Sequence, residues 1–480
     1  MFKNLTASKF ILSTSLAIMS YIMLTKYKQK YTEKQIKKKM SVAHFLSLGY
    51  IITILIGTFL LMLPIASKTN SMTNFTDSLF TATSATCVTG LIPFQTFGHW
   101  TIFGQIIIII LIQIGGLGFM TIITLVFMFF KKNIGLYNRT ILMQSAGSYN
   151  ISGVTTLMKR ILIGTLIFEG LGAIILTLCF WKDMGAMAIY YGIFHSISAF
   201  CNAGFDLFHS TNGSLTEYYN NPVVLITIML LIIIGGLGFI VWSDIIDKRF
   251  KFKNYHLHTK IVLVWNAILI VIPAILFFIF EFTMLGQDGH YCNYTIGEKI
   301  LNSFFLSVSP RTAGFNSINL NELTSSGFLL TIVLMFIGGN SGSTAGGLKV
   351  TTFVVIIMNL LSSVQGKEDC VMFKRKISNT IIKQASSLFL AYLGLAVIAT
   401  LLISSFENFA IQDIMFEVVS ALGTVGLSIG ISGEACIMTK VILILLMYAG
   451  RIGALTLFDA LIKNQKDLVL KKPEGKIMVG

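Results

Sequence analysis

Charged residues are scarce in this chain of 480 residues. Asp, Glu, Lys and Arg make up 12% of it, about half the share in a typical soluble protein. Hydrophobic residues make up 54%, and six prolines stand beside 41 glycines. So apolar a chain is neither disordered nor collagen-like. The composition predicts a polytopic membrane protein rather than several soluble domains.

The sequence also lacks the motifs of common enzymes and metal sites. Its six cysteines are scattered, without a C-x-x-C or Cys/His cluster, so neither a disulfide framework nor a zinc site is predicted. Patterns such as Gly116-Leu117-Gly118 lie inside apolar runs rather than after a strand, which disfavours dinucleotide binding. There is no Walker A motif and no nucleophile–base signature. We therefore predict no catalytic residue, no enzymatic activity and no covalently bound cofactor.

Eight apolar runs are long enough to cross a bilayer as helices, which need about 20 residues each. They cover roughly 43–66, 102–130, 160–181, 223–245, 261–284, 328–359, 386–406 and 440–462. A ninth run, 10–25, is short and flanked by lysines. It is interpreted as an interfacial or marginal anchor rather than a cleaved signal peptide, although a short extra span is an alternative.

The basic residues predict the orientation of these spans. Seven lysines lie in 26–40, and five Lys or Arg residues lie in each of 130–160, 246–260, 364–383 and 463–480. The alternate connections carry almost none. By the positive-inside rule the basic connections and the C-terminus are cytoplasmic. Topology and contact with anionic lipid account for most of the net charge of +15, so no nucleic-acid partner is predicted.

Four segments between spans share one pattern: a short helix-like stretch, an irregular segment that ends in glycine, and a large apolar residue. We call the three residues that end at each glycine a glycine triplet. The triplets are Val88-Thr89-Gly90, Asn202-Ala203-Gly204, Thr312-Ala313-Gly314 and Thr424-Val425-Gly426. Their glycines are 114, 110 and 112 residues apart. Such even spacing indicates an internal repeat rather than isolated loop glycines.

Each repeat is predicted to consist of a span, a re-entrant half-helix with its triplet, and a second span that also contains glycine. All repeats enter the membrane the same way, because each ends in a basic loop. The predicted fold is therefore all-α, with four parallel span–pore-loop–span repeats around a pseudo-fourfold pore. The predicted segments are a basic N-terminal segment at 1–40, repeats at 41–131, 156–248, 257–362 and 380–463, and a cytoplasmic tail at 464–480.

Irregular backbone at membrane depth is stable only where it is buried or lines an aqueous cavity. Four loops around one axis would form rings of carbonyl oxygens that select a partly dehydrated monovalent cation. The C-terminal ends of the half-helices would add negative potential there. The triplets are thus the predicted ion filter.

The triplets also carry a resemblance to a known family. Thr424-Val425-Gly426 matches the start of the potassium-channel signature, and the other three are degenerate versions of it. Together with the run from Pro310 to Asn316, they resemble the KtrB/TrkH family of potassium-translocating membrane subunits, and KtrB most closely. The resemblance implies potassium at the filter residues of a Ktr-type uptake system. It also implies a homodimer with one pore per protomer and a cytosolic, KtrA-like regulatory ring that binds a nucleotide.

A glycine-rich loop interrupts the second span of the third repeat. It reads Gly338-Gly339-Asn340-Ser341-Gly342-Ser343-Thr344-Ala345-Gly346-Gly347-Leu348-Lys349. Only about ten apolar residues precede it, which are too few for a span, so the break is predicted to lie inside the membrane. A surface turn is the alternative. The resemblance implies a gate below the filter.

Some charged residues that lie in or next to the apolar regions have predicted roles. Arg451 is either an electrostatic barrier below the filter or a structural group that pairs with helix-end carbonyls or an acid. Lys349 is predicted to be a cytoplasmic anchor rather than a second barrier. Arg311 should point away from the ions, with Glu417 as one candidate partner. Glu169 is predicted to be paired in the interior, with a coupling-ion site as the alternative.

Two other functions compete with selective potassium uptake. A sodium or mixed-cation pathway would use the same fold. A secondary transporter of another class would predict inverted repeats and broken helices in paired positions. The repeats are parallel, and only one second span contains an obvious break, which disfavours the secondary transporter.

Overall fold

The computed structural model describes residues 42–118, 153–208, 214–283, 291 and 294–453. The predicted N-terminal segment at 1–40 with its apolar run, the part of the second predicted span beyond residue 118, and the tail at 464–480 lie outside these residues.

Each repeat begins with a long apolar helix. These helices are α2 (Val42–Met62), α8 (Val154–Met184), α12 (Leu257–Phe282) and α16 (Asn379–Ser404). Within the described part of the chain, they are the four unbroken helices that are long and apolar enough to cross a membrane. If two helices joined by a sharp bend are counted as one span, the described residues contain five spans.

A short helix follows in every repeat, as predicted. These helices are α3 (Phe75–Cys87), α9 (Met187–Cys201), α13 (Ile296–Val308) and α17 (Ile411–Gly423). They contain 13 to 15 residues, too few to cross a bilayer. Three of them end immediately before their triplet, whereas α13 ends four residues before Thr312.

In three repeats the apolar helix that follows the triplet ends early, at a glycine. Helices α5 (Ile102–Leu117), α10 (Pro222–Leu237) and α19 (Ile437–Ile452) each have 16 residues. They end at Gly118, Gly238 and Gly453, whose φ angles are 82°, 99° and 92°. Glycine adopts positive φ without steric cost, so it can end a helix amid apolar residues.

The prediction of one continuous helix over 223–245 is therefore wrong. At Gly238 the chain turns by 89° into α11 (Phe239–Asp247). The residues on both sides of the bend are apolar, so the length of the apolar run alone does not reveal the bend. In the third repeat, α14 (Ser325–Phe336) and α15 (Val350–Val364) flank the glycine-rich loop, where a break was predicted.

Within the described residues, the connections contain only short elements. They are η1 (Pro64–Ala66), α4 (Thr96–His99), η2 (Thr216–Tyr218), η3 (Phe252–Asn254), η4 (Leu320–Glu322), α18 (Ile431–Glu434) and the strands β1 (Val371–Met372) and β2 (Arg375–Lys376). The strands pair antiparallel, with Val371 opposite Lys376. Apart from this hairpin the described fold is all-α, as predicted.

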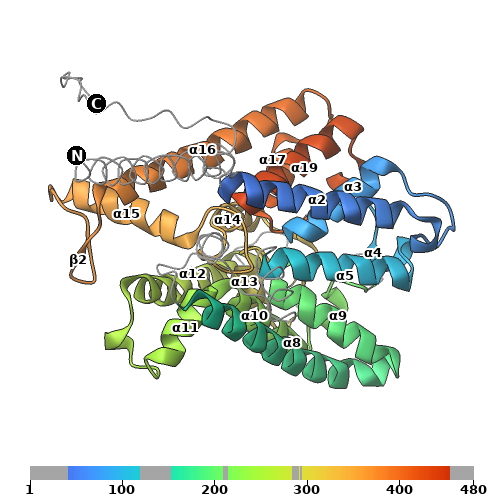
Figure 1. Cartoon of the computed structure of the whole chain (residues 1–480), viewed down its shortest axis with the longest axis horizontal. Helices are drawn as coiled ribbons and strands as arrows, with labels where there is room; N and C mark the ends of the chain where they lie inside the picture. The colour runs from blue at the N-terminus through green and yellow to red at the C-terminus, as the bar shows by residue number, and fades with distance from the viewer. Residues whose placement is uncertain (1–41, 119–152, 209–213, 284–290, 292–293, 454–480) are drawn as a thin grey trace, which may run out of the picture. The chain divides into compact units, whose positions relative to one another are not determined.

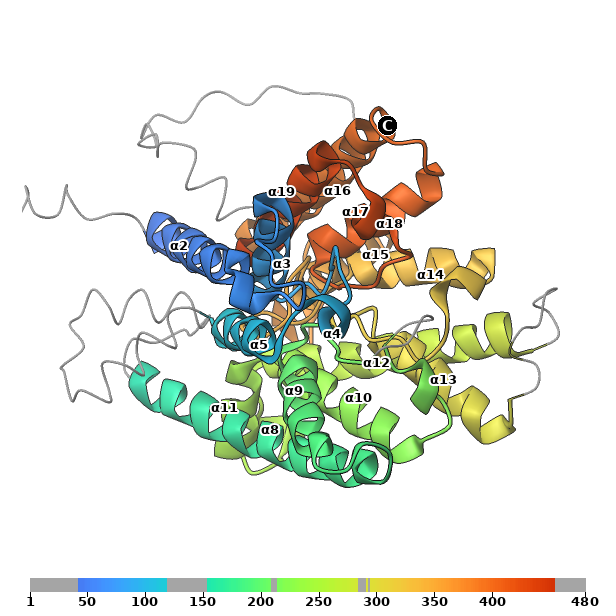
Figure 2. The same cartoon turned by 90° about the vertical axis from the view of Figure 1, so that its right-hand side faces the viewer.

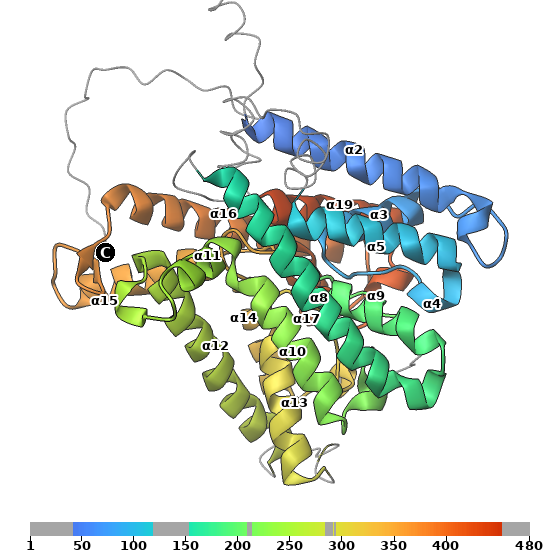
Figure 3. The ribbon, with the colours of Figure 1, turned by 60° about the horizontal axis from the view of Figure 1, so that its bottom comes forward.

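The repeats follow one another around a common centre. Figure 2 shows the first repeat with α3 and α5 in blue, the second in green below it, the third in yellow on the right and the fourth in orange to red at the top. Within repeats, α3 packs on α5, α8 on α9, α12 on α13 and α17 on α19 (Figure 1). Figure 3 shows α8, α9 and α10 running beside one another.

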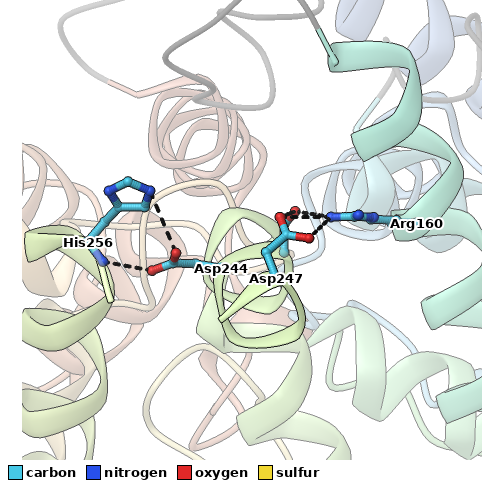
Figure 4. A network of polar contacts seen from close by, with 5 residues as sticks. Arg160, Asp244, Asp247 and His256 are labelled. Carbon is cyan, nitrogen blue, oxygen red and sulfur yellow. Dashed lines mark hydrogen bonds and ion pairs between the residues drawn. The ribbon is translucent and has the colours of Figure 1, made fainter. Parts of the chain in front are cut away.

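Polar contacts hold the bent helix α11 in place (Figure 4). The Nη1 atom of Arg160 in α8 lies 2.9 Å from Oδ1 of Asp247. One helical turn away from that pair, Asp244 accepts a hydrogen bond of 2.9 Å from the backbone N–H of His256, just before α12. The helix after the bend is thus tied to the first helices of two repeats.

Candidate functional site

The glycine triplets share an unusual backbone conformation. The first residues Val88, Asn202, Thr312 and Thr424 have φ angles of 57°, 59°, 78° and 51°. The glycines that end the triplets have φ angles of 97°, 69°, 77° and 93°. Three of the four first residues are β-branched, and such residues rarely adopt positive φ. Each carries about 1–3 kcal/mol of strain, which persists only where the surroundings fix the backbone.

Serines at the ends of the short helices provide part of that support. In the first repeat, the Ser84 carbonyl accepts the Thr89 N–H at 2.8 Å and its hydroxyl accepts the Gly90 N–H at 3.0 Å. Ser420 makes the same two bonds in the fourth repeat, at 2.9 and 3.1 Å. In the second repeat the Ser198 carbonyl likewise accepts the Ala203 N–H at 2.8 Å, but its hydroxyl donates to the Phe205 carbonyl at 2.7 Å.

The four triplets touch one another in a closed ring. A Cβ atom added to Gly90 would lie 2.5 Å from the carbonyl oxygen of Ala203 in the second repeat. Equivalent atoms on Gly204, Gly314 and Gly426 would lie 2.8, 2.4 and 2.2 Å from the carbonyl oxygens of Ala313, Val425 and Thr89. Each triplet thus meets the next repeat, and the fourth meets the first. These contacts agree with the predicted pseudo-fourfold arrangement.

A second set of glycines lets the last helices approach the triplets. A Cβ on Gly115 would lie 2.0 Å from the Thr86 carbonyl oxygen, and one on Gly235 would lie 2.0 Å from that of Phe200. One on Gly450 would lie 2.1 Å from that of Leu422. In each case the carbonyl belongs to the residue two positions before a triplet. Helix crossings this close exclude any side chain.

The ring has two different faces. On one face, all four triplet glycines line a single cavity of about 330 Å³. On the other, the glycine-rich loop packs against the start of the fourth triplet, because a Cβ on Gly346 would lie 2.0 Å from Thr424 Oγ1. The ring therefore separates an open cavity from the loop.

The glycine-rich loop contacts other repeats. The N–H of Thr344 donates to the Gly235 carbonyl at 3.3 Å, and the Asn340 amide donates to the Gly236 carbonyl at 2.8 Å. The N–H of Gly347 donates to the Gly450 carbonyl at 3.2 Å. The loop is thus fixed to the second and fourth repeats at the ends of their last helices.

Arg451 joins this loop to the first repeat. Its guanidinium group donates to the carbonyl of Thr344 in the loop, and to the carbonyls of Gly115 and Gly116 in the last turn of α5. These contacts match the structural alternative, in which the arginine pairs with helix-end carbonyls. They also place a fixed positive charge beside the ring.

Lys349 was predicted to be a cytoplasmic anchor, but its ammonium group binds within the glycine-rich loop. The Nζ atom donates to the carbonyls of Ala345 at 2.7 Å and Gly346 at 3.2 Å. The cation thereby satisfies backbone oxygens that the irregular loop leaves without helical partners.

The suggested pairing of Arg311 with Glu417 is wrong. Arg311 is buried and donates to the carbonyl and side-chain oxygens of Asn266 in α12 of its own repeat. Glu417 is buried behind the fourth triplet, where its carboxylate accepts from the hydroxyls of Ser428 and Ser432. Both side chains bind uncharged polar groups rather than each other, and charge pairing along the sequence does not reveal these partners.

Glu169 is paired in the interior, in agreement with the default interpretation. Its two carboxylate oxygens accept from Gln113 Nε2 at 3.1 and 3.2 Å, and the thiol of Cys201 lies beside it. This cluster joins α8, α5 and the end of α9 next to the second triplet.

Sequence reasoning missed the side chains that follow the triplets. Ile92, Asp206, Asn316 and Ser428 each lie two positions after a triplet glycine, and all four line the cavity. Aligning the four repeats on their glycines would have brought these positions together.

Comparisons with known proteins agree with this architecture. A model of the family TrkH, described as "Cation transport protein", matches residues 10–470. The potassium/sodium uptake protein NtpJ of Enterococcus hirae is 41% identical over 93% of this chain and 99% of its own length. The Ktr system potassium uptake protein B of Bacillus subtilis is 38% identical over 91% of this chain and 96% of its own.

A solved structure shows the same fold. The potassium transporter TrkH from Vibrio parahaemolyticus matches with a TM-score of 0.68 and 18% sequence identity, covering 86% of this chain and 84% of that one. The apolar helices and the match over nearly the whole chain identify a multi-pass membrane protein. The matched family and relatives are membrane cation transporters, not enzymes. The chain belongs to the TrkH family of cation transport proteins.

Proposed function

We propose that this protein is the potassium-selective translocating subunit of a Ktr-type uptake system. The ion passes through a filter that the twelve residues of the four glycine triplets form. The observation that carries this proposal is the closed ring, in which each triplet glycine lies against the carbonyl of the next repeat. A ring of backbone from four loops offers closely spaced carbonyl oxygens, which can replace part of the hydration shell of a monovalent cation.

The glycine-rich loop and Arg451 act as the gate of this pathway. The loop lies on the face of the ring opposite the cavity and binds two other repeats directly. The guanidinium of Arg451 ties it to the first repeat and opposes cations at the same place. Movement of the loop would therefore alter both the obstruction and the charge that an ion meets.

The gate is the natural point of control by a partner. In this proposal the protein is a homodimer, and a cytosolic KtrA-like ring that binds a nucleotide docks on the basic loops, with the C-terminus on the cytoplasmic side. The names of the Bacillus subtilis and Vibrio alginolyticus relatives refer to a Ktr system, which supports a multi-component assembly. The basic connections predicted to be cytoplasmic offer a positively charged docking surface.

A sodium or mixed-cation pathway is the second candidate, because the Enterococcus hirae relative is named a potassium/sodium uptake protein. The two candidates predict different ion requirements. The decisive experiment is growth of a potassium-uptake-deficient cell at micromolar potassium, with sodium varied. Rescue without sodium supports selective potassium uptake, and rescue that requires sodium supports coupling. Failure of the expressed protein, with its partner, to rescue at any sodium concentration would contradict the proposal.

A further inference from the structure

The residues after each triplet alternate between the interior and the cavity. The first of them, Leu91, Phe205, Phe315 and Leu427, are at most 2% exposed. The second, Ile92, Asp206, Asn316 and Ser428, line the cavity on which the triplet glycines open. The four repeats thus present a ring of side chains immediately beyond the glycine ring, which we call the outer ring.

The outer ring is chemically asymmetric. It offers an aliphatic group, a carboxylate, an amide and a hydroxyl. Asp206 is the only ionisable side chain among the described residues that line this cavity. No lysine or arginine among them neutralises it there. A single negative charge in a narrow cavity concentrates cations, because low-dielectric walls focus its field.

Hydrogen bonds fix the chain around Asp206 and Asn316. Asp206 Oδ1 accepts the N–H of Phe208 at 3.1 Å. The backbone of Asn316 is fixed on both sides, since its N–H donates to the Ser214 hydroxyl at 3.0 Å and its carbonyl accepts from the Leu215 N–H at 2.8 Å. The Asp206 side chain and the backbone at Asn316 are therefore fixed in place.

Asn316 adds a second, independent observation. Its side-chain Oδ1 is buried and has no hydrogen-bond partner within the described part of the protein. A buried acceptor in this state is stabilised by a donor or a cation. An amide oxygen beside a cavity with one carboxylate suits a monovalent cation, whereas calcium sites need six to eight oxygens and several carboxylates.

We propose that Asp206 and Asn316 form an outer binding site that captures the transported cation before it enters the filter. This inference rests on the proposed function. The carboxylate raises the local cation concentration, and the amide oxygen replaces one of the lost water ligands. Ile92 leaves one side of the ring apolar, which favours a site that holds the ion off-centre towards the second and third repeats.

The test is potassium-dependent uptake, followed with a rubidium tracer, in proteoliposomes that contain the purified protein together with its cytosolic partner. Asp206→Asn removes the charge and keeps the side chain's size and its acceptor for Phe208. We expect the half-saturating cation concentration to rise roughly 3- to 10-fold at low ionic strength, with a smaller change in maximal rate. The difference from the parent protein should shrink as an impermeant salt is added, since ions partly screen a charge that lines an open cavity.

Two further variants separate charge from ligation. Asn316→Ala should also raise the half-saturating concentration, but equally at low and high salt, because it removes a neutral oxygen. Glu217→Gln serves as the matched control, since Glu217 is an exposed carboxylate in the connection that follows the second triplet and does not line the cavity.

The parent protein gives a test that needs no substitution: its half-saturating concentration should rise with ionic strength. An unchanged half-saturating concentration in Asp206→Asn, or an equal rise in Glu217→Gln, would overturn the outer site while leaving the proposed function intact. A parent protein without cation-dependent uptake would instead contradict the proposed function itself.

Discussion

Gly346 of the glycine-rich loop lies directly against Thr424, the first residue of the fourth triplet. A Cβ atom on Gly346 would fall 2.0 Å from Oγ1, 2.9 Å from Cγ2 and 3.0 Å from Cβ of Thr424. Loop and triplet are therefore in van der Waals contact, with no space for even a methyl group. Movement of the loop must therefore also displace Thr424 in the ring of triplets.

Gly346→Ala should displace either the loop or Thr424. We expect a loss of about 1–3 kcal/mol of stability, as for an overpacked core, and a changed ratio of potassium to sodium flux. Thermal stability in detergent and flux in proteoliposomes measure the two effects. Gly394→Ala in α16 is the control, because nothing lies within 4 Å of the added atom. If both variants behave alike, the contact has no role in transport.

Substitution of the triplet glycines should weaken ion discrimination. In Gly90→Ser the new side chain meets the Ala203 carbonyl at 2.5 Å, at a φ angle of 97° that disfavours any L side chain. Strain of about 1–3 kcal/mol should lower the potassium/sodium flux ratio roughly tenfold while transport persists. Unchanged ratios in all four Gly→Ser variants would remove the filter assignment.

Deletion of residues 339–347 tests the gate. The residues on either side of the deletion already meet, since the Gly338 N–H donates to the Leu348 carbonyl at 2.8 Å. The two ends left by the deletion therefore lie side by side. We expect higher potassium flux and weaker control by the cytosolic partner. A folded deletion variant with unchanged or lower flux would show that the loop is no barrier.

Arg451→Gln and Arg451→Lys distinguish the two roles of the guanidinium group. Neither replacement can reach carbonyls in both the loop and α5, so the structural role predicts a loss of about 1–3 kcal/mol in both. The barrier role predicts higher flux, with a rise that shrinks at high salt, for the neutral glutamine alone. If both variants keep wild-type stability and flux, Arg451 has neither the structural role nor the barrier role.

Asp77 and Lys440 form a buried ion pair that links the first repeat to the fourth. The carboxylate and ammonium atoms are 2.8 Å apart, and the side chains are 11% and 12% exposed. Asp77→Asn leaves a buried cation unpaired and should lower the free energy of unfolding by about 3–5 kcal/mol. Thermal unfolding in detergent measures this loss.

The double variant Asp77→Asn with Lys440→Met provides the matching control. Removing both charges should recover most of the stability, because the uncompensated cation is gone. If the double variant loses as much stability as Asp77→Asn alone and Lys440→Met alone lose together, the broken ion pair is not the cause of the instability.

The sequence alone was sufficient for the repeat and for the positions of the four glycine triplets. The even spacing of Gly90, Gly204, Gly314 and Gly426 between apolar runs defined four units. Irregular backbone at membrane depth has the same structural requirements in every repeat, so the same residue types return at the same positions. The break at 338–349 was predicted for the same reason, since polar and glycine residues cannot continue a lipid-facing helix.

Only the tertiary structure showed which residues make each long-range contact. The sharp bend at Gly238, the binding of Arg311 to Asn266 and the carbonyl partners of Arg451 join segments that local patterns describe separately. Positive φ at Val88 or Thr424 runs against local preference and exists because four repeats fix one another. Local sequence specifies helices and breaks through short-range energies. Partners 45 to several hundred residues apart are chosen by packing, and packing is set only when the repeats close into a ring.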